Sequence, residues 1–227
     1  LIMAFQTVKA WAKSEDDGRS WLSFFRKVPA STATVTGQWF DYSTASGVPV
    51  PNYYASSPLV AALLEAENGI YVPEQSTKRF IKKSIIMSAA NSVTNTTNQN
   101  QPLMLLDYLL YYPFIDLDAA GEEQVLDNTV ELSRYTDGVG VHIMVVAQAP
   151  TVGGGSFTVT YIDNNDVQQT TGTIFCAAAQ PSGALVTSVA AAAGITPFIP
   201  LNINVRGVKR IISVTMNVAN GGLAAFV

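Results

Sequence analysis

The stretch "SFTVTYIDNNDVQQTTGTIF", from Ser156 to Phe175, decides the fold class of this chain. Phe157, Val159 and Tyr161 alternate with threonine or isoleucine, which is the period of a half-buried β-strand. After the polar tip at 163–166, the chain continues in strand-forming residues as far as Ala177. We therefore expect a β-hairpin with arms at 156–163 and 166–177.

The tip of this hairpin offers four oxygen-bearing side chains, Asp163, Asn164, Asn165 and Asp166, which is the ligand type that Ca²⁺ prefers. The EF-hand pattern also requires Gly at its sixth position and Glu at its twelfth. Gln168 and Ile174 occupy those positions here, so the pattern fails. Because Asn and Asp readily cap their own turns, we interpret the tip as a turn.

Further strand patterns predict an all-β chain, a β-sandwich or jelly roll. Asn220-Gly221-Gly222 lies between apolar segments and predicts a hairpin turn. Two domains are expected, with an N-terminal arm and small subdomain at 1–80 and the β-sandwich at 81–227. The expected strands are at 78–93, 102–115, 138–149, 184–190, 198–205, 209–218 and 223–227.

Residues 29–57 are rich in Ser, Thr, Pro and Gly, which argues against a helix. They also contain five aromatic rings, which argues against disorder. We interpret the segment as an extended arm that is anchored by its rings and is ordered only where partners bury it. The rings belong to Trp39, Phe40, Tyr42, Tyr53 and Tyr54.

Two shorter segments allow either a helix or a strand. One lies around 19–28, "RSWLSFFRKV". The other is "SPLVAALLEAENG", in which Ser57 is a possible N-cap, Pro58 stands at the first helical position and Gly69 is a possible stop. We favour a short helix for this second segment and keep a strand as the alternative.

The composition predicts a protein that is partly covered by partners. Charged residues make up 13% of the 227 residues, about half of the ~25% of an average soluble domain. Mean hydropathy is +0.22. A membrane helix needs about 20 apolar residues, whereas the best run, 102–115, has 14 and contains Asp107. No secretory signal is evident at the N-terminus.

Charge is unevenly distributed along the chain. Residues 1–83 hold nine basic and seven acidic side chains, whereas residues 84–227 hold four basic and ten acidic ones. The two parts therefore carry +2 and −6. Such an asymmetry suits electrostatic docking against a neighbouring subunit. It suits nucleic acid poorly, because most of the chain repels phosphate.

Other residues with chemical potential have simpler structural interpretations. The only histidine, His142, and the only cysteine, Cys176, both lie in apolar strand-like sequence, which favours structural roles over catalytic ones. Strand alternation predicts that His142 points away from the face of Ile143. The glycines 153–155 precede a strand and not the helix that a phosphate cradle needs. The sequon at Asn95 has the glycosylation pattern in form only.

Two charged clusters are also more simply explained as surface. The acidic group lies in a loop-like sequence, so a solvated loop is preferred to a pair of catalytic carboxylates. The basic cluster "TKRFIKK", 77–83, is interpreted as a contact to an acidic neighbour. The acidic group consists of Asp116, Asp118, Glu122 and Glu123.

Several stretches together resemble virion structural proteins of tailed bacteriophages, from about residue 20 to the end of the chain. The resemblance implies a β-sandwich or jelly-roll protein of the mature particle at the capsid, and no active site to carry over. The stretches are "GQWFDYSTASGVPVPNYYASSPL", "LLDYLLYYPFID", "LDNTVELSRYTDGVGVHIMVV", "GGGSFTVTYIDNNDV" and "VRGVKRIISVTMNVANGGLAAFV".

We therefore expect a non-enzymatic virion protein, without a cofactor or metal, that stabilises the capsid as a cement or decoration protein. The expected partners are the major capsid protein or other virion subunits and further copies of the chain, for which a trimer suits local threefold positions. Assembly is expected in the host bacterial cytoplasm. The alternative is a tail-associated receptor- or carbohydrate-binding module.

Overall fold

The structure is a computed structural model of the whole chain. The chain divides into two compact units, each described here by itself: one contains residues 1–23 and 72–107, and the other contains residues 24–71 and 108–227. These bounds differ from the expected division at 80/81. The structure describes residues 7–17, 22–28, 38–64, 69–70, 81, 84–85, 103–177, 179–188 and 196–227.

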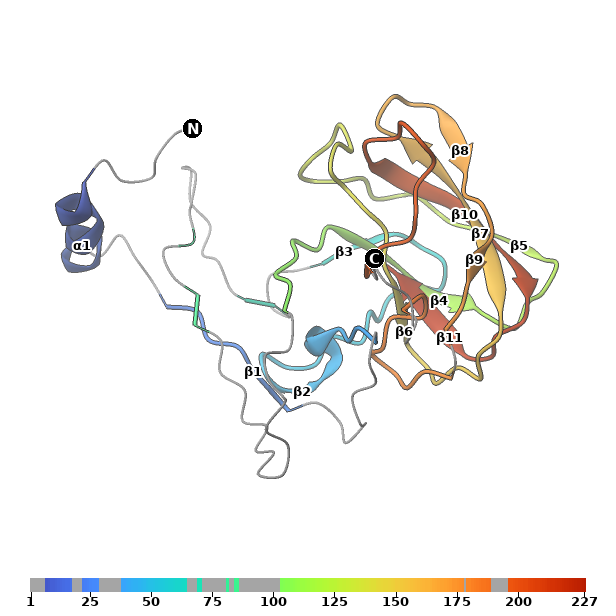
Figure 1. Cartoon of the computed structure of the whole chain (residues 1–227), viewed down its shortest axis with the longest axis horizontal. Coiled ribbons are helices and arrows are strands. Elements are labelled where there is room, and N and C mark those ends of the chain that lie inside the picture. The colour runs from blue at the N-terminus through green and yellow to red at the C-terminus, as the bar shows by residue number, and fades with distance from the viewer. Residues whose placement is uncertain are drawn as a thin grey trace. The chain divides into compact units, whose positions relative to one another are not determined.

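The first unit contains the helix α1 (Val8–Asp16), drawn in dark blue in Figure 1. The hydroxyl of Thr7 accepts a hydrogen bond from the amide of Ala10 at 3.0 Å and so caps the helix. Near its end, Lys13 and Asp17 approach to 3.9 Å at the i,i+4 spacing. No helix in the described part of the chain combines the length and the apolar character required to cross a membrane.

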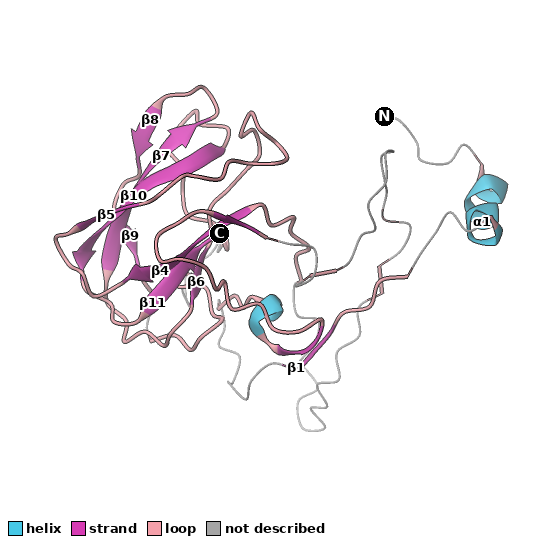
Figure 2. Cartoon of the chain, turned by 180° about the vertical axis from the view of Figure 1, so that it is seen from behind, coloured by secondary structure: helices cyan, strands magenta, loops and turns pink. Residues whose placement is uncertain are grey.

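The second unit is built from antiparallel sheets, as the all-β prediction requires (Figure 2). A five-stranded sheet has the order β5–β10–β7–β8, with β9 also paired to β7. Its strands are β5 (Glu123–Val125), β7 (Ser156–Asp163), β8 (Gln168–Thr170), β9 (Ile174–Phe175) and β10 (Val208–Val218). A four-stranded sheet has the order β3–β4–β11–β6 and consists of β3 (Ala62–Leu63), β4 (Leu110–Asp116), β6 (Val145–Ala147) and β11 (Leu223–Phe226).

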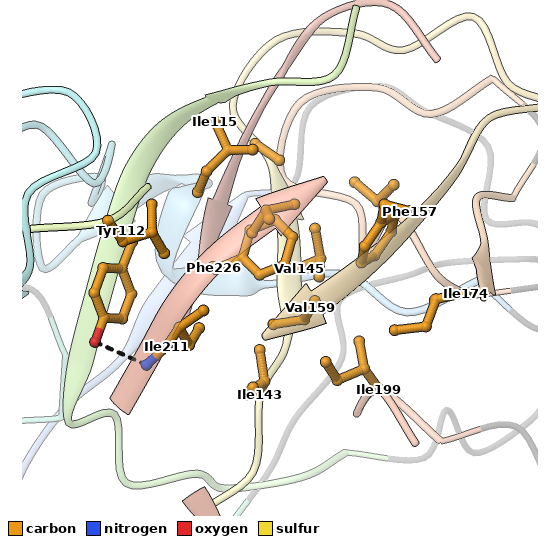
Figure 3. Close-up of a cluster of buried hydrophobic side chains, with 14 of the residues drawn as sticks. Tyr112, Ile115, Ile143, Val145, Phe157, Val159, Ile174, Ile199, Ile211 and Phe226 are labelled. Carbon is orange, nitrogen blue, oxygen red and sulfur yellow. Dashed lines mark hydrogen bonds between the residues drawn. The ribbon is translucent and has the colours of Figure 1, made fainter. Parts of the chain in front are cut away.

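Both sheets contribute side chains to a single buried apolar cluster (Figure 3). The rings of Phe157 on β7 and Phe226 on β11 meet edge to face, with centroids 5.5 Å apart. Tyr112 of β4 also connects the two sheets, because its hydroxyl accepts a hydrogen bond from the amide of Ile211 on β10 at 3.3 Å. The burial of these faces excludes water from one shared core.

The predicted hairpin is confirmed. Phe157, Val159 and Tyr161 are all fully buried, and β7 pairs antiparallel with both β8 and β9. The returning arm is interrupted at Thr171, whose backbone amide donates to the carbonyl of Val159 and whose hydroxyl accepts from the amide of Val159. The Thr171 hydroxyl thus takes the place of a backbone carbonyl in the pairing with β7.

The hairpin predicted at Asn220-Gly221-Gly222 is wrong. The strands on either side, β10 and β11, belong to different sheets. The turn is instead held by the loop that follows β4, since Asn220 N–H donates to the Leu117 carbonyl and Gly221 N–H to the Asp118 carboxylate. The pattern correctly located a glycine-rich turn, but tertiary hydrogen bonds direct the chain from one sheet to the other.

The helix favoured for 57–69 is also wrong within the described residues, and the strand alternative is correct. Leu59 has a positive φ of 62°, which is incompatible with an α-helix. Ala61 donates to the carbonyl of Asp127 at 2.8 Å, and β3 pairs with β4. Pairing with these distant strands satisfies the backbone and overrides the local propensity.

The described part of the aromatic segment, 38–57, belongs to the second unit and pairs with other segments of it. Phe40 forms an antiparallel bridge with Ala184, and the amide of Asp41 donates to the carbonyl of Gly183 at 2.9 Å. Tyr54 is almost fully buried. Rings that the sequence assigns to partner contacts are therefore used partly within the chain.

The shared core predicts a strong response to truncation at its centre. We expect Phe157→Ala to lower the free energy of unfolding by about 3–5 kcal/mol, because it removes a fully buried ring and leaves a cavity. Urea denaturation measures this change. The matched control, Phe175→Ala, removes an exposed ring and should change stability by less than about 0.5 kcal/mol. Equal effects of the two changes contradict a core centred on Phe157.

Candidate functional site

The strands β1 (Arg26–Val28) and β2 (Ser46–Val48) form a separate two-stranded sheet, here called the ribbon. Arg26 lies opposite Val48, and continuation of this register places Phe24 opposite Val50. Gly47 allows the close approach of the strands, because a Cβ at this position would collide with the carbonyl oxygen of Arg26.

The outer face of the ribbon is exposed and mostly apolar, with Ser46 opposite Val28 as a polar residue. Phe24, Val28, Val48 and Val50 retain 65%, 59%, 56% and 65% of their accessible surface. Arg26 lies among them and is exposed, and within the described residues no carboxylate pairs with it. An apolar face with one unpaired cation is unusual for a solvated sheet and typical of an interaction surface.

The inner side of the ribbon is fixed by Lys27. Its ammonium lies between 2.7 and 3.3 Å from four carbonyl oxygens. Desolvation lowers the pKa of Lys27, and the nearby carboxylate of Asp41 opposes this effect. The ammonium thus ties β1 to the following loop and keeps the apolar face outward. The carbonyls belong to Ser43, Ala45, Pro49 and Val50.

A buried carboxylate, Asp41, organises the same loop. It caps the short 3₁₀ turn η1 (Tyr42–Thr44), since Oδ1 accepts from the amide of Ser43 and Oδ2 accepts from its hydroxyl, both at 2.8 Å. The hydroxyl of Tyr54 also donates to Oδ2. The ring of Tyr54 packs edge to face on Tyr111 of β4, with centroids 5.4 Å apart.

Two tyrosines near this carboxylate have raised pKa values. Burial is the main cause for both Tyr54 and Tyr108, and the charge of Asp41 adds to it. Both phenols therefore stay protonated and act as hydrogen-bond donors. The carboxylate is occupied by donors of its own chain, so this cluster is an anchor for the ribbon loop and not a free general base.

Sequence reasoning did not identify this anchor. Asp41 and Ser43 are typical of a capped turn, a signal that is visible in "FDYST". Nothing local connects Lys27 with the carbonyl at Pro49, or Tyr108 with Asp41. These residues meet only through tertiary packing.

The tip of the β7–β8 hairpin is a turn, as its Asn and Asp residues predict. Asp163 Oδ1 accepts from the amides of Asn165 at 2.7 Å and Val167 at 3.0 Å. Asp163 Oδ2 accepts from the side chain of Gln169 at 3.1 Å. Asp166 forms an ion pair of 2.7 Å with Lys209, which docks the tip on β10. These oxygens are engaged by the chain itself.

The same contacts set the ionisation of Asp163. Desolvation acts to raise its pKa, but the hydrogen bonds from Val167, Asn165 and Gln169, together with the charge of Lys209, outweigh it. The pKa of Asp163 is therefore lowered. A carboxylate held in this way stabilises the turn in its charged form.

The single histidine and the single cysteine have different surroundings. His142 is exposed and its ring packs on Phe198 at 5.0 Å between centroids, while the neighbouring Ile143 is buried. The exposure of His142 beside the buried Ile143 agrees with the predicted orientation, but residues 141–143 precede β6 and are not part of a strand. Cys176 is buried in the apolar cluster, and burial raises the pKa of its thiol to about 12.

The remaining predicted groups do not form a joint site in the described structure. Asp116 Oδ1 accepts from the amide of Asp118 at 2.8 Å, and Glu123 accepts from the buried hydroxyl of Ser213 at 2.6 Å. The glycines at 153–155 lead into β7 and not into a helix. Within the described ranges no three His, Cys, Asp or Glu side chains group as metal ligands.

Two predicted groups fall outside this part of the chain. The basic cluster at 77–83, except Ile81, and the sequon at Asn95 lie outside the described residues.

No family model, curated protein or solved structure matches this chain.

The lowered pKa of Asp163 predicts how the stability of the protein changes at acid pH. Because its pKa in the folded state is below the ordinary value of about 3.9, its contribution is fully present above that value and is lost as pH falls through the folded-state pKa. We expect Asp163→Asn to destabilise the protein at pH 7 and to differ progressively less from the wild type below about pH 4.

Urea denaturation between about pH 7 and pH 2 checks this prediction. Glu122→Gln, which changes an exposed carboxylate without an ion pair to the described residues, is the matched control and should show no comparable change with pH. A constant difference between Asp163→Asn and the wild type at all pH values is evidence against the role of the charge.

The hydrogen bonds of Lys27 are expected to control the local stability of the ribbon. We expect Lys27→Met to lower the free energy of local opening of the ribbon by about 1–3 kcal/mol, because a charged donor to several carbonyls is lost. Hydrogen exchange of the amides in β1 and β2 should accelerate, while exchange in β7 and β10 should not change. Arg26→Met is the control, and equal acceleration in both variants rules out a specific clamp.

Proposed function

We propose that this chain is a non-enzymatic structural protein of a tailed-phage virion, which binds and stabilises the capsid shell as a cement or decoration protein. The resemblance of five stretches of its sequence to such proteins supports this proposal. The proposed partners are the major capsid protein, other virion subunits and further copies of this chain, and the proposed location is the virion.

The observation that carries the proposal is the outer face of the ribbon. Phe24, Val28, Val48 and Val50 form an apolar surface on a chain with only 13% charged residues. The inner side of the same ribbon is fixed by Lys27, and Asp41 caps its loop. A rigidly presented apolar face of this kind suits burial against a neighbouring subunit of an assembly.

We also propose that the two larger sheets form a β-sandwich of the jelly-roll type. Their shared core, with Phe157 against Phe226, supports the two-layer arrangement. The crossing between sheets at 220–222 supports connections of the kind that jelly rolls use.

The alternative is a tail-associated module that binds a receptor or carbohydrate. Tyr135 is more than half exposed in a loop that also contains the exposed Asp137. Exposed aromatic rings and carboxylates are suitable contacts for a sugar. Glycan-array binding by the purified protein favours this alternative, whereas binding to shells that lack the protein favours a capsid role.

The proposal predicts incorporation that depends on the ribbon. We expect mass spectrometry to detect the chain in purified particles of the phage that encodes it, at the copy number of a shell component. We expect Phe24→Ser with Val50→Ser to reduce rebinding to depleted particles by more than about tenfold, because buried apolar anchors carry much of the affinity of an interface.

The matched control is Val152→Ser with Ile203→Ser, which removes two exposed apolar side chains away from the ribbon. This variant should bind like the wild type. Deletion of the whole segment 29–57 is a poorer test, since it removes the buried Tyr54. Absence of the chain from purified particles refutes the proposed function.

A further inference from the structure

We propose that the ribbon docks on an apolar protein surface that carries a carboxylate, and that Arg26 selects this partner. The inference rests on the proposed function and deepens it, because it states the chemistry that the neighbouring subunit offers. One cation lies within the mostly apolar outer face of the ribbon, and the described part of the chain provides no anion for it.

Arg26 lies between apolar side chains on the outer face. Exposure alternates from residue 24 to residue 28, so Phe24, Arg26 and Val28 point to the same side. Val48 lies directly opposite Arg26 on β2, and side chains in such a pair are about 5 Å apart between Cβ atoms. A surface that buries these three apolar side chains therefore also covers the stem of Arg26.

The described residues provide no partner for the guanidinium of Arg26. Its side chain takes part in no ion pair or hydrogen bond with them. Asp41, in the loop that adjoins the ribbon, is held by Ser43 and by the hydroxyl of Tyr54. Lys27, on the inner side, is bound by carbonyl oxygens of the same loop. Of the two cations in β1, the outer one is therefore left without a described acceptor.

A covered guanidinium requires an anion. Removal of water from a charged group is costly unless the group is paired and hydrogen-bonded. A carboxylate meets both needs, because it accepts two parallel hydrogen bonds from the planar guanidinium. A subunit that buries Phe24, Val28 and Val48 should therefore place an Asp or Glu side chain opposite Arg26.

A second ribbon does not meet this requirement. The outer face contains no carboxylate, since its residues are Phe24, Arg26, Val28, Ser46, Val48 and Val50. Two ribbons face to face also bring two guanidinium groups together, and like charges across an interface oppose association. A charge within an otherwise apolar strand is one of the devices that keep exposed strands from associating with their own kind. Arg26 thus disfavours self-docking and favours an acidic partner surface.

The test measures binding of the full chain to particles from which the chain has been removed, with association and release followed separately. Arg26→Met keeps a side chain of similar length and removes the charge. We expect this variant to be released more than about tenfold faster than the wild type, because the partner carboxylate is then buried without a cation. Arg26→Lys keeps the charge but lacks the planar fork, so its release should be intermediate.

Two controls separate this effect from a general one. Arg206→Met removes another exposed cation without a described ion pair, and it should bind like the wild type. Hydrogen exchange of the amides in β1 and β2 should be the same in Arg26→Met and the wild type. A loss of binding in Arg26→Met is then not caused by an unfolded ribbon.

A carbodiimide, which couples amines to carboxylates in contact, identifies the partner group. The amine introduced at position 26 by Arg26→Lys should be joined to an Asp or Glu side chain of the subunit that covers the ribbon. Mass spectrometry of the digested particles locates the link. The wild type, whose guanidinium is not coupled, should give no link at position 26.

Three results overturn the inference. The first is binding of Arg26→Met that equals or exceeds wild-type binding, because the guanidinium then needs no anion in the complex. The second is a bound Arg26→Lys variant that gives no link at position 26. The third is self-association of the wild type in sedimentation experiments that Phe24→Ser with Val50→Ser abolishes, since a second ribbon then covers the face.

The two proposals fail in distinguishable ways. If the chain is absent from purified particles, the proposed function is wrong. If the chain is present and rebinding depends on Phe24 and Val50 but not on Arg26, the function stands and the carboxylate partner is wrong.

Discussion

The second unit depends on the burial of two apolar sheet faces in one core. Phe157 of β7 and Phe226 of β11 meet at its centre, and neither ring retains exposed surface. Tyr112 bridges the sheets by accepting from Ile211 N–H and donating to Asn128. Because each sheet is amphipathic, neither is stable in water without the other.

This constraint determines how the loops are used. The chain passes from β10 to β11 through two glycines with positive φ, and the Leu117 carbonyl and the Asp118 carboxylate satisfy the turn. At the other end, Asp163 satisfies the amides of its own turn. The backbone amides at 165, 167, 220 and 221 are therefore paired within the chain, whereas the buried side-chain amide of Asn220 has no hydrogen-bond partner among the described residues.

The ribbon follows a different principle. Its polar contacts are on the inner side, at Lys27 and Asp41, while its apolar residues face outward. In a protein that is surrounded only by water, the opposite arrangement is more stable. In the isolated chain these apolar side chains remain in contact with water. Their burial by a neighbouring subunit would release this unfavourable hydration free energy, which links the fold to the proposed role in an assembly.

The sequence by itself determined the strand-rich character of the chain and the positions of β7, β10 and β11, whereas 184–188 and 198–205, which were also expected to be strands, form only isolated bridges. The alternation in 156–163 specifies both β7 and the face that it buries, because a period of two is a local property of the chain. The turn at 163–166 was predictable for the same reason, since Asp163 bonds residues only two to six positions away.

Only the tertiary structure decided which strands are neighbours. The turn at 220–222 has the sequence of a hairpin, yet it connects two sheets, and Leu59 and Ala61 pair with Asp127 in place of forming a helix. Hydrogen bonds between residues distant in sequence outweigh local preferences of about 1 kcal/mol or less per residue. The cluster of Lys27, Asp41 and Tyr54 was likewise invisible in the sequence, because its partners are brought together only by the packing of the ribbon loop on the body.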